Sequence, residues 1–315
     1  MTRTALVTGA NSGIGLATAL ELARRGHRTV GTVRSPAKAK VLRAAAADAG
    51  VEVESAILDV TDADRCSSVI ERFTPDILIN NAGYAQTAPV ESVDDAAAEH
   101  LLGTMLVAPI RLARLALPHM RANGWGRIVN VSSILGRVTM PLTGWYQASK
   151  HGLEAVSDAL RIECAADGVA VVLVEPGFFR TAIFEDLEAD ADRYGHGRYD
   201  VVYDRMRTNM ERWEPLMGDP SSVASSISSE GGNLADLGYM REYIDDLPYT
   251  GEVMNLSLAS WEEWSAKEQI EFMHRLEGKI NYYQALHDHT DLWVTPGGGS
   301  VNGNSMFPVV LDLLP

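Results

Sequence analysis

The chain has 315 residues, 46% of them hydrophobic, and carries a formal net charge of −15. This is enough apolar material for one large domain with a sizeable core and a smaller additional segment. Residues 181–263 hold 18 Asp and Glu but only 6 Arg and no Lys, a net charge of 6 − 18 = −12. Such an acidic surface would repel phosphates, so we expect no nucleic-acid partner and no membrane partner.

Three features indicate the cellular compartment. No uninterrupted apolar run is long enough to span a membrane. The first residues lead directly into an expected strand, so we expect no signal peptide. The two cysteines, Cys66 and Cys164, are isolated in the sequence, which favours reduced core thiols over a disulfide. We therefore expect a cytoplasmic protein.

A glycine-rich loop follows the first expected strand, residues 4–8, and precedes a helix expected from about Ile14 to Arg25. Glycines let the backbone turn tightly and approach a pyrophosphate, and the helix N-terminus offers that group free N–H donors. A strand before the loop and a helix after it make this a strong nucleotide-binding signal. The candidate cofactor-binding residues of the loop are Gly9, Asn11, Ser12, Gly13, Ile14 and Gly15.

The end of the second expected strand, residues 28–33, bears on which cofactor is bound. An acidic residue there would accept hydrogen bonds from the adenosine ribose hydroxyls, but this chain has Val33 followed by Arg34. A guanidinium fork suits a 2′-phosphate. We therefore predict NADP(H) rather than NAD(H), with a plain surface role for Arg34 as the alternative.

The most informative stretch runs from Ser133 to Lys150. Tyr146 and Lys150 are four residues apart, so on a helix they share one face. An ammonium one turn away is expected to lower the phenol pKa and let Tyr146 give or take a proton at neutral pH. Ser133 follows an expected buried strand, residues 127–131, where its hydroxyl can hold a substrate oxygen beside Tyr146.

These residues, together with the Gly-x-x-x-Gly-x-Gly loop, resemble the short-chain dehydrogenase/reductase family over residues 1 to about 229. The resemblance implies that Tyr146 is the acid/base, that Lys150 binds the nicotinamide ribose and that Ser133 orients the substrate. It also implies a homo-oligomer and a small-molecule carbonyl or alcohol substrate. Further cofactor-binding residues implied in this way are Asp59, Asn81, Ala82, Gly83, Tyr146, Lys150, Pro176, Gly177 and Thr181.

Alternating expected strands and helices predict the fold class, an α/β protein with a doubly wound parallel sheet of Rossmann-like type. Further strands are expected at residues 52–58, 76–80 and 169–174, and a long helix from about Ala96 to Arg121. Asp59 has a competing role as a plain helix N-cap. Asn81 is expected to hold backbone groups of neighbouring strands.

One position departs from the resemblance. Counting back from the Leu117–Met120 segment, the family's Asn that anchors a water in the proton relay falls at Met105. A thioether cannot hold a water as an amide can. Three interpretations stay open: the relay runs through backbone carbonyls and solvent, proton transfer is impaired, or the chemistry is altered.

The C-terminal part is less informative. Residues 182–220, where the family carries its substrate lid, are acidic and aromatic, which favours a bulky or apolar substrate. A helix is expected to begin at Asp219-Pro220, and the Ser/Gly-rich run 225–232 is interpreted as a linker. Residues 230–315 are expected to form a small α/β appendage that loosely resembles an uncharacterised bacterial domain. His287, His289 and Asp291 are interpreted as loop residues, and no metal site is predicted.

Three functions follow as hypotheses. The first is an NADP(H)-dependent oxidoreductase that interconverts a carbonyl and a secondary alcohol, with Tyr146 moving the proton. The second is a cofactor-binding module with weak or no dehydrogenase activity and a C-terminal interaction domain, which Met105 and the appended segment motivate. The third is a non-redox reaction on the same fold.

Overall fold

The computed structural model describes residues 2–137, 139–177, 179–180, 187–195, 197–213 and 217–228. The chain separates into two compact units, Met1–Met240 and Arg241–Pro315, and every described residue belongs to the first unit. Several sequence predictions therefore lie outside the described residues: those on Thr181, on parts of the segment 182–220, and on the segment 230–315 with His287, His289 and Asp291. The boundary between residues 229 and 230 stays a prediction.

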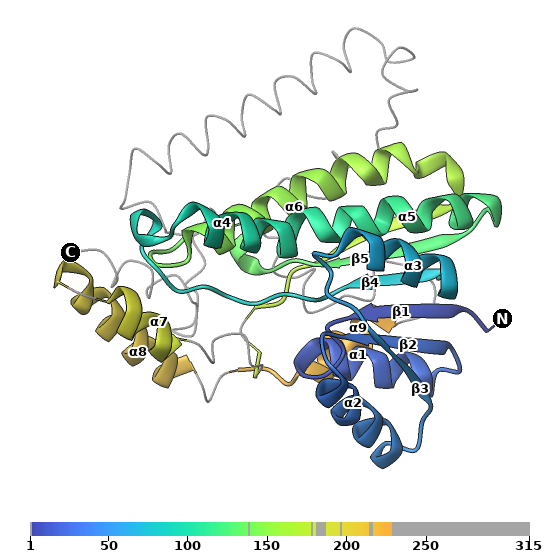
Figure 1. Ribbon diagram of the computed structural model, residues 1–315, viewed down its shortest axis with the longest axis horizontal. Helices are drawn as coiled ribbons and strands as arrows, with labels where there is room; N and C mark the ends of the chain where they lie inside the picture. Colours follow the sequence, from blue (N-terminus) through green and yellow to red (C-terminus); the bar gives the residue numbers. More distant parts are fainter. Residues whose placement is uncertain are drawn as a thin grey trace, which may run out of the picture. The chain divides into compact units, whose positions relative to one another are not determined.

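The described residues contain a six-stranded parallel sheet in the order β3-β2-β1-β4-β5-β6 (Figure 1). Its strands are β1 (Thr4–Thr8), β2 (Arg28–Val33), β3 (Val53–Ile57), β4 (Ile77–Asn80), β5 (Gly126–Val131) and β6 (Val169–Val174). The order reverses between β1 and β4. In open α/β sheets ligands bind at such a switch point, beyond the carboxyl ends of the strands.

Helices cover both faces of the sheet, as the apolar pattern of the strands requires. On one face lie α3 (Ala63–Phe73), α5 (Ala108–Ala122) and α6 (Gly144–Glu163), and on the other lie α1 (Gly13–Arg24), α2 (Pro36–Asp48) and α9 (Pro220–Ser228) (Figure 1). Two buried clusters fill the layers between sheet and helices. The predicted doubly wound parallel sheet is confirmed, and the strand bounds agree with the expected ones within a residue.

The long helix expected from Ala96 to Arg121 is interrupted. It consists of α4 (Asp95–Leu102), a π-helical turn η2 (Gly103–Val107) and α5. At this turn the Ala108 N–H donates to the Gly103 carbonyl, five residues back. Pro109 follows and has no N–H to donate to the Met105 carbonyl, which would be its helical partner. The Met105 carbonyl therefore cannot accept the usual α-helical hydrogen bond from residue 109.

The linker predicted from residue 225 is wrong in its first part, because α9 continues to Ser228. Val223 and Ala224 are buried, and Val223 belongs to the core cluster that includes residues of α1. The Arg25 guanidinium donates to the Ser228 carbonyl at 2.6 Å. Burial of apolar side chains and a capped carbonyl hold these serines in a helix despite their low helix propensity.

One helical stretch, Asp95–Ala122, is long and apolar enough by length and composition to cross a membrane, with a mean hydropathy of 1.4. This is weak support for a membrane span. The α5 part of this stretch contributes Leu112, Ala113 and Ala116 to a buried cluster with sheet residues, as a core helix of a globular domain does.

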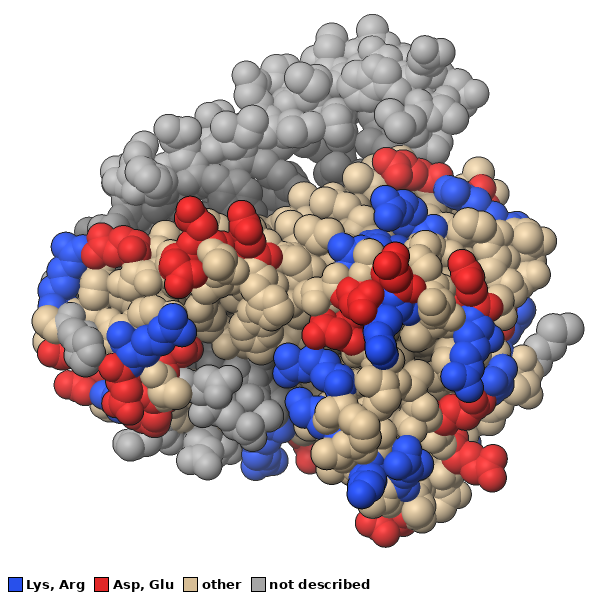
Figure 2. Space-filling view, in the orientation of Figure 1, with Lys and Arg blue, Asp and Glu red and all other residues tan. Residues whose placement is uncertain are grey.

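Two helices, α7 (Leu187–Tyr194) and α8 (Asp200–Trp213), occupy the region where the sequence predicts a substrate lid. Figure 2 shows acidic and basic side chains interspersed over one face of the described surface. Ion pairs of this region include Arg207 with Glu188 at 3.0 Å and Arg198 with Glu91. Arg207 thus pairs with an acidic residue within this region, whereas Arg198 pairs with a residue outside it.

Candidate functional site

The loop between β1 and α1 has the shape that its glycines allow. Gly9 and Gly13 have φ values of +67° and +52°, in the left-handed region that side chains disfavour. A Cβ on Gly15 would lie 2.4 Å from the Gly9 carbonyl oxygen. Ser12 is the N-cap of α1 but its side chain makes no capping hydrogen bond. The first-turn N–H groups of α1 are thus free of a side-chain cap, as a pyrophosphate site needs.

Asn81 ties this loop to the centre of the sheet. Its side-chain amide donates to the carbonyls of Thr8 at 2.9 Å and Gly9 at 3.3 Å, as the sequence predicts. The Thr8 hydroxyl in turn accepts from the backbone N–H groups of Asn81 and Ala82 at 2.9 and 3.0 Å. Sequence reasoning did not single out Thr8, although its place directly before Gly9 was visible.

Arg34 and Asp59 lie at neighbouring strand ends, after β2 and β3. Arg34 is exposed, and its positive charge contributes to lowering the pKa of Asp59 after two hydrogen bonds from Thr61. The N-cap of α3 is Asp62, which accepts from the Arg65 N–H. The alternative N-cap role for Asp59 is therefore wrong, and Asp59 closes a turn instead.

Ser133, Tyr146 and Lys150 come together as the sequence predicts. Ser133 follows β5, and Tyr146 and Lys150 lie on the buried face of α6. Tyr146 is 4% exposed, and the Ser133 hydroxyl, which accepts the Leu135 N–H at 3.1 Å, lies near enough to lower the pKa of the phenol. The Lys150 Nζ donates to the Val131 carbonyl at 2.7 Å and lies 5.7 Å from the centre of the Tyr146 ring.

The expected effect of Lys150 on Tyr146 is not found. Burial raises the pKa of the Tyr146 phenol to about 12, and only the hydrogen bond with Ser133 works against this. Burial also lowers the pKa of Lys150 to about 8, with Glu154 acting in the opposite direction. In this environment, the cost of burying the phenolate outweighs the attraction of an ammonium already engaged by the Val131 carbonyl. The phenol is therefore a protonated donor at neutral pH.

Met105 is built into the same cluster. It is 1% exposed and packs with Ala85, Leu101, Leu135 and Tyr146. Its sulfur accepts the Tyr84 backbone N–H at 3.4 Å, and a Cβ on Gly83 would lie 2.5 Å from that sulfur. The helix has thus been repacked around the thioether, which uses its acceptor on the loop after β4.

The segment after β6 closes the other side of the site. The Pro176 carbonyl accepts the Ile134 N–H at 3.1 Å, so this turn lies beside the Ser133 loop. A Cβ on Gly177 would meet no atom within 4 Å, which leaves open space at this position. Pro176 and Gly177 thus border the site, while Thr181 lies outside the described residues.

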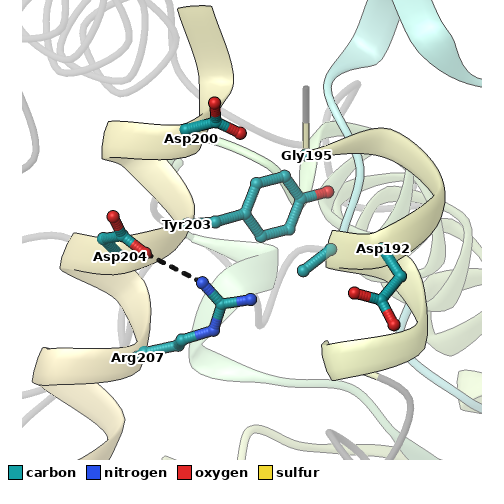
Figure 3. Close-up of a pocket in the computed structure, with 7 residues that line it drawn as sticks. Asp192, Gly195, Asp200, Tyr203, Asp204 and Arg207 are labelled. Carbon is teal, nitrogen blue, oxygen red and sulfur yellow. Dashed lines mark hydrogen bonds and ion pairs between the residues drawn. The ribbon is translucent and has the colours of Figure 1, made fainter. Parts of the chain in front are cut away.

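Side chains of α7 and α8 form hydrogen bonds with the backbone of Thr87, in the loop after β4. Its N–H donates to Asp190 at 2.8 Å, and its carbonyl accepts the hydroxyl of Tyr203, a 1% exposed residue of α8, at 2.6 Å. Figure 3 shows the Tyr203 ring between α8 and α7, beside a polar pocket of about 340 Å³. Sequence reasoning counted Tyr203 among the lid aromatics but gave it no partner.

The fold and the site together invite comparison with known proteins. The sequence model of the short chain dehydrogenase family matches residues 3–192. The chain belongs to the short-chain dehydrogenase family.

Relatives agree with this family assignment. YusZ, an uncharacterized oxidoreductase of Bacillus subtilis strain 168, is 35% identical over 282 residues, which cover 84% of this chain and 96% of YusZ. Since 0.84 × 315 is about 265 residues, this similarity continues past residue 229. A cis-4-hydroxycyclohexanecarboxylate dehydrogenase of Sinomonas cyclohexanicum is 39% identical over 237 residues, covering 72% of this chain and 88% of that protein.

Solved structures of the family have the same architecture. A short-chain dehydrogenase from Streptomyces avermitilis is 30% identical, with a TM-score of 0.59 over 78% of this chain and 95% of that one. A variant of actinorhodin polyketide ketoreductase with bound NADPH is 30% identical, with a TM-score of 0.62 over 72% of this chain and 89% of that one. The protein is thus an oxidoreductase of the short-chain dehydrogenase family.

The residues present fit a nicotinamide dinucleotide. At Gly9 and Gly15 the loop has no room for a Cβ, and the Ser12 side chain does not cap α1. A Cβ on Gly177 would meet no atom of the described residues within 4 Å. Among the described residues there is no group of three His, Cys, Asp or Glu side chains arranged to hold a metal ion.

Proposed function

We propose that this protein is an NADP(H)-dependent oxidoreductase that interconverts a carbonyl and a secondary alcohol on an apolar small molecule. The observation that carries the proposal is the Ser133–Tyr146–Lys150 arrangement at the switch point of the sheet, beside a glycine loop shaped for a pyrophosphate. Bound nicotinamide would supply or accept the hydride. Side chains and backbone groups of this chain would bind the cofactor, orient the substrate and move the proton.

Cofactor binding is proposed to begin at the β1–α1 loop. Its N–H groups would hold the pyrophosphate. Arg34 is exposed and lies near Asp59. The residue at the end of β2 is Val33 and not an acidic residue, which supports NADP(H). The remaining proposed contacts are Asp59 to the adenine, Asn81, Ala82 and Gly83 along the ribose, Lys150 at the nicotinamide ribose, and Pro176, Gly177 and Thr181 around the nicotinamide.

Tyr146 is proposed to move the proton, with Ser133 orienting the substrate oxygen. In the reducing direction the phenol donates its proton to the carbonyl oxygen as the carbon receives the hydride. With a pKa raised to about 12 the phenol is protonated at neutral pH, which is the form that carbonyl reduction needs. The Met105 carbonyl, which Pro109 cannot occupy, is a backbone acceptor through which solvent can resupply that proton.

The neighbourhood of Tyr146 supports an apolar substrate. Tyr84, Ile134, Met140 and Trp145 pack around the cluster that contains Tyr146 and Met105. Such walls bind apolar groups while one or two hydroxyls fix the orientation of the reacting oxygen.

A second candidate, a cofactor-binding module with a weak dehydrogenase site, draws support from Met105 alone.

Two finer expectations also stand as proposals. One is a cytoplasmic protein. The other is a homo-oligomer, which the exposed Val107 and Val156 on contacting elements favour; light scattering of the wild type and a Val156→Lys variant tests it.

The test of the activity is NADPH oxidation with a panel of ketones and aldehydes of increasing size, together with the Tyr146→Phe variant. We expect turnover that falls about 10²–10⁴-fold in Tyr146→Phe while NADPH affinity is kept. Tight NADPH binding without turnover of any carbonyl would shift support to the binding module. Equal turnover by Tyr146→Phe would remove Tyr146 from the mechanism.

A further inference from the structure

A carboxylate lies one helical turn beyond Lys150. Tyr146, Lys150 and Glu154 are spaced four residues apart and share the buried face of α6. Glu154 is 4% exposed and Lys150 is 6% exposed. Side chains at this spacing are neighbours on a helix, and two opposite charges shielded from water interact strongly. Glu154 is therefore placed to act on the amine that serves the site.

Glu154 shares its partner with a second carboxylate. The Arg137 Nη2 lies 2.9 Å from Glu154 Oε2 and 2.9 Å from Glu175 Oε1. Arg137 follows the short 3-10 turn η3 (Ile134–Gly136) after Ser133, and Glu175 directly precedes Pro176. This ion triad thus links the three segments that carry the site: the loop after β5, α6 and the turn after β6.

The surroundings leave Glu154 only partly compensated. Within the described part of the chain, neither of its buried carboxylate oxygens accepts a hydrogen bond of good geometry. The pKa of Glu154 is raised to about 7, first by burial and then by Glu175, while Ser132 and Arg137 act in the opposite direction. Asp158, one turn further along α6, acts on Arg137. Arg137 carries one positive charge against the two carboxylates of Glu154 and Glu175, and therefore cannot neutralise both.

Among the described residues, Glu154 is the charged group that acts on the pKa of Lys150. Burial lowers the pKa of Lys150, and the charge of Glu154 is what raises it. Without this carboxylate, burial alone would act on the amine and deprotonate it at lower pH. The neutral Val131 carbonyl accepts a hydrogen bond from the amine but supplies no net charge.

We propose that Glu154 is a positioning residue that acts as the counter-ion of Lys150, keeping the amine protonated, while Arg137 and Glu175 set how much of the Glu154 charge reaches it. The inference rests on the proposed function, since it concerns the lysine assigned to the nicotinamide ribose. It adds to that function a charged partner for the lysine on α6 and a structural link to both flanking loops.

The chain offers a direct test because it contains only five lysines, Lys38, Lys40, Lys150, Lys267 and Lys279. Side-chain ¹³C-labelled lysine in the full-length protein gives a simple NMR spectrum, in which a Lys150→Arg variant identifies the Lys150 signal. The titration of that signal is followed in the wild type and in the Glu154→Gln and Glu175→Gln variants. Asp167→Asn, which removes a partly exposed carboxylate paired with Arg121, is the matched control.

In the wild type we expect the Lys150 signal to show two coupled inflections, one from Glu154 and one from the amine. In Glu154→Gln the first disappears and the second moves down by about one pH unit or more. In Glu175→Gln the first moves to lower pH, because a like charge near Glu154 is removed. Asp167→Asn leaves both in place. A Lys150 titration that is unchanged in Glu154→Gln would overturn the proposal. If Glu154→Gln does not fold, the Glu175→Gln variant is decisive, and an unchanged first inflection there would overturn the proposal.

The titration needs neither cofactor nor turnover, so its outcome is separate from that of the proposed activity. If the wild type reduces carbonyls, the basic limb of its kcat/KM profile should move to lower pH in Glu154→Gln by the same shift as the amine. A limb that stays in place while the amine pKa moves would show that Lys150 protonation does not limit the reaction, and would remove Glu154 from it.

Discussion

Met105 has different contacts for its side chain and its backbone. Its side chain fills the space beside Gly83 and Tyr146 and accepts the Tyr84 N–H, so the thioether stabilises the loop after β4. Its carbonyl is left without a helical donor by Pro109. We propose that proton resupply uses the backbone at this position, while the side chain packs the loop after β4.

Met105→Asn is therefore expected to lower the melting temperature without raising turnover. An amide in this buried cluster has polar atoms without partners, at a cost of about 1–3 kcal/mol. Met105→Leu keeps the volume and loses only the sulfur acceptor, so its cost should stay below about 1.5 kcal/mol. Thermal unfolding followed by circular dichroism measures both. Higher turnover with unchanged melting in Met105→Asn would contradict this and restore the side-chain relay.

Arg34 is the residue that we expect to select the cofactor. Arg34→Ala should weaken NADPH binding by at least about tenfold while NADH binding changes little, because a charge-assisted hydrogen bond to the 2′-phosphate is lost. Arg43→Ala is the control, since Arg43 is also a basic residue of this half but donates to Ser55. Cofactor fluorescence titration gives both affinities. Equal losses for NADPH and NADH would assign Arg34 to general electrostatics.

At the scale of elements, α7 and α8 depend on the backbone of Thr87 for their position. Both of its polar groups are engaged by lid side chains, and the neighbouring Ala88 N–H donates to the Leu142 carbonyl at 2.6 Å. Leu142 has a φ of +66°, an unfavourable value for a leucine, and its side chain is buried among lid residues. The lid contacts thus hold a strained residue just before α6.

Tyr203→Phe is expected to loosen the lid. It leaves the Thr87 carbonyl buried without its donor, which costs about 1–3 kcal/mol locally. Faster proteolytic cleavage within residues 187–213 and a higher KM for bulky carbonyls should follow, with NADPH affinity unchanged. Tyr199→Phe is the matched control, because the Tyr199 hydroxyl donates to the exposed Glu91. Equal cleavage rates in the two variants would show that the buried hydrogen bond does not hold the lid.

At the scale of the whole molecule, the buried site is a source of instability that depends on pH. Lys150 has its pKa lowered to about 8 in the folded protein, against an ordinary value of 10.5. Folding therefore carries a penalty for burying the ammonium that is fully present below about pH 8 and disappears as pH rises towards 10.5. The net charge of −15 adds a general repulsion at high pH that any variant shares.

The stability of the wild type relative to Lys150→Met should rise between pH 8 and 10.5, because the penalty for burying the ammonium disappears over this range. The pH-dependent part is about 3 kcal/mol at most, because one pKa unit corresponds to about 1.4 kcal/mol. Chemical denaturation at a series of pH values measures it. A stability difference that is constant over this range would mean that Lys150 has an ordinary pKa in the folded protein.

The sequence by itself determined the positions of the strands along the chain, the parallel sheet and the glycine loop. It also determined the grouping of Ser133, Tyr146 and Lys150. These follow from local rules: apolar runs, glycine spacing and helix periodicity act over a few residues, and strand ends of a doubly wound sheet meet at one edge. It also located Met105 as a departure. The spacing of Glu154 behind Lys150 was visible as well, but nothing local showed that this helix face is buried.

Only the tertiary structure decided the electrostatics and the long-range contacts. The direction of the Tyr146 pKa shift depends on how deeply the phenol is buried, and that depth is set by packing from segments distant in sequence. The Arg137–Glu154–Glu175 triad and the Tyr203–Thr87 hydrogen bond likewise join residues up to 116 positions apart. Desolvation and charge pairing are properties of three-dimensional neighbours, so no periodicity along the chain encodes them.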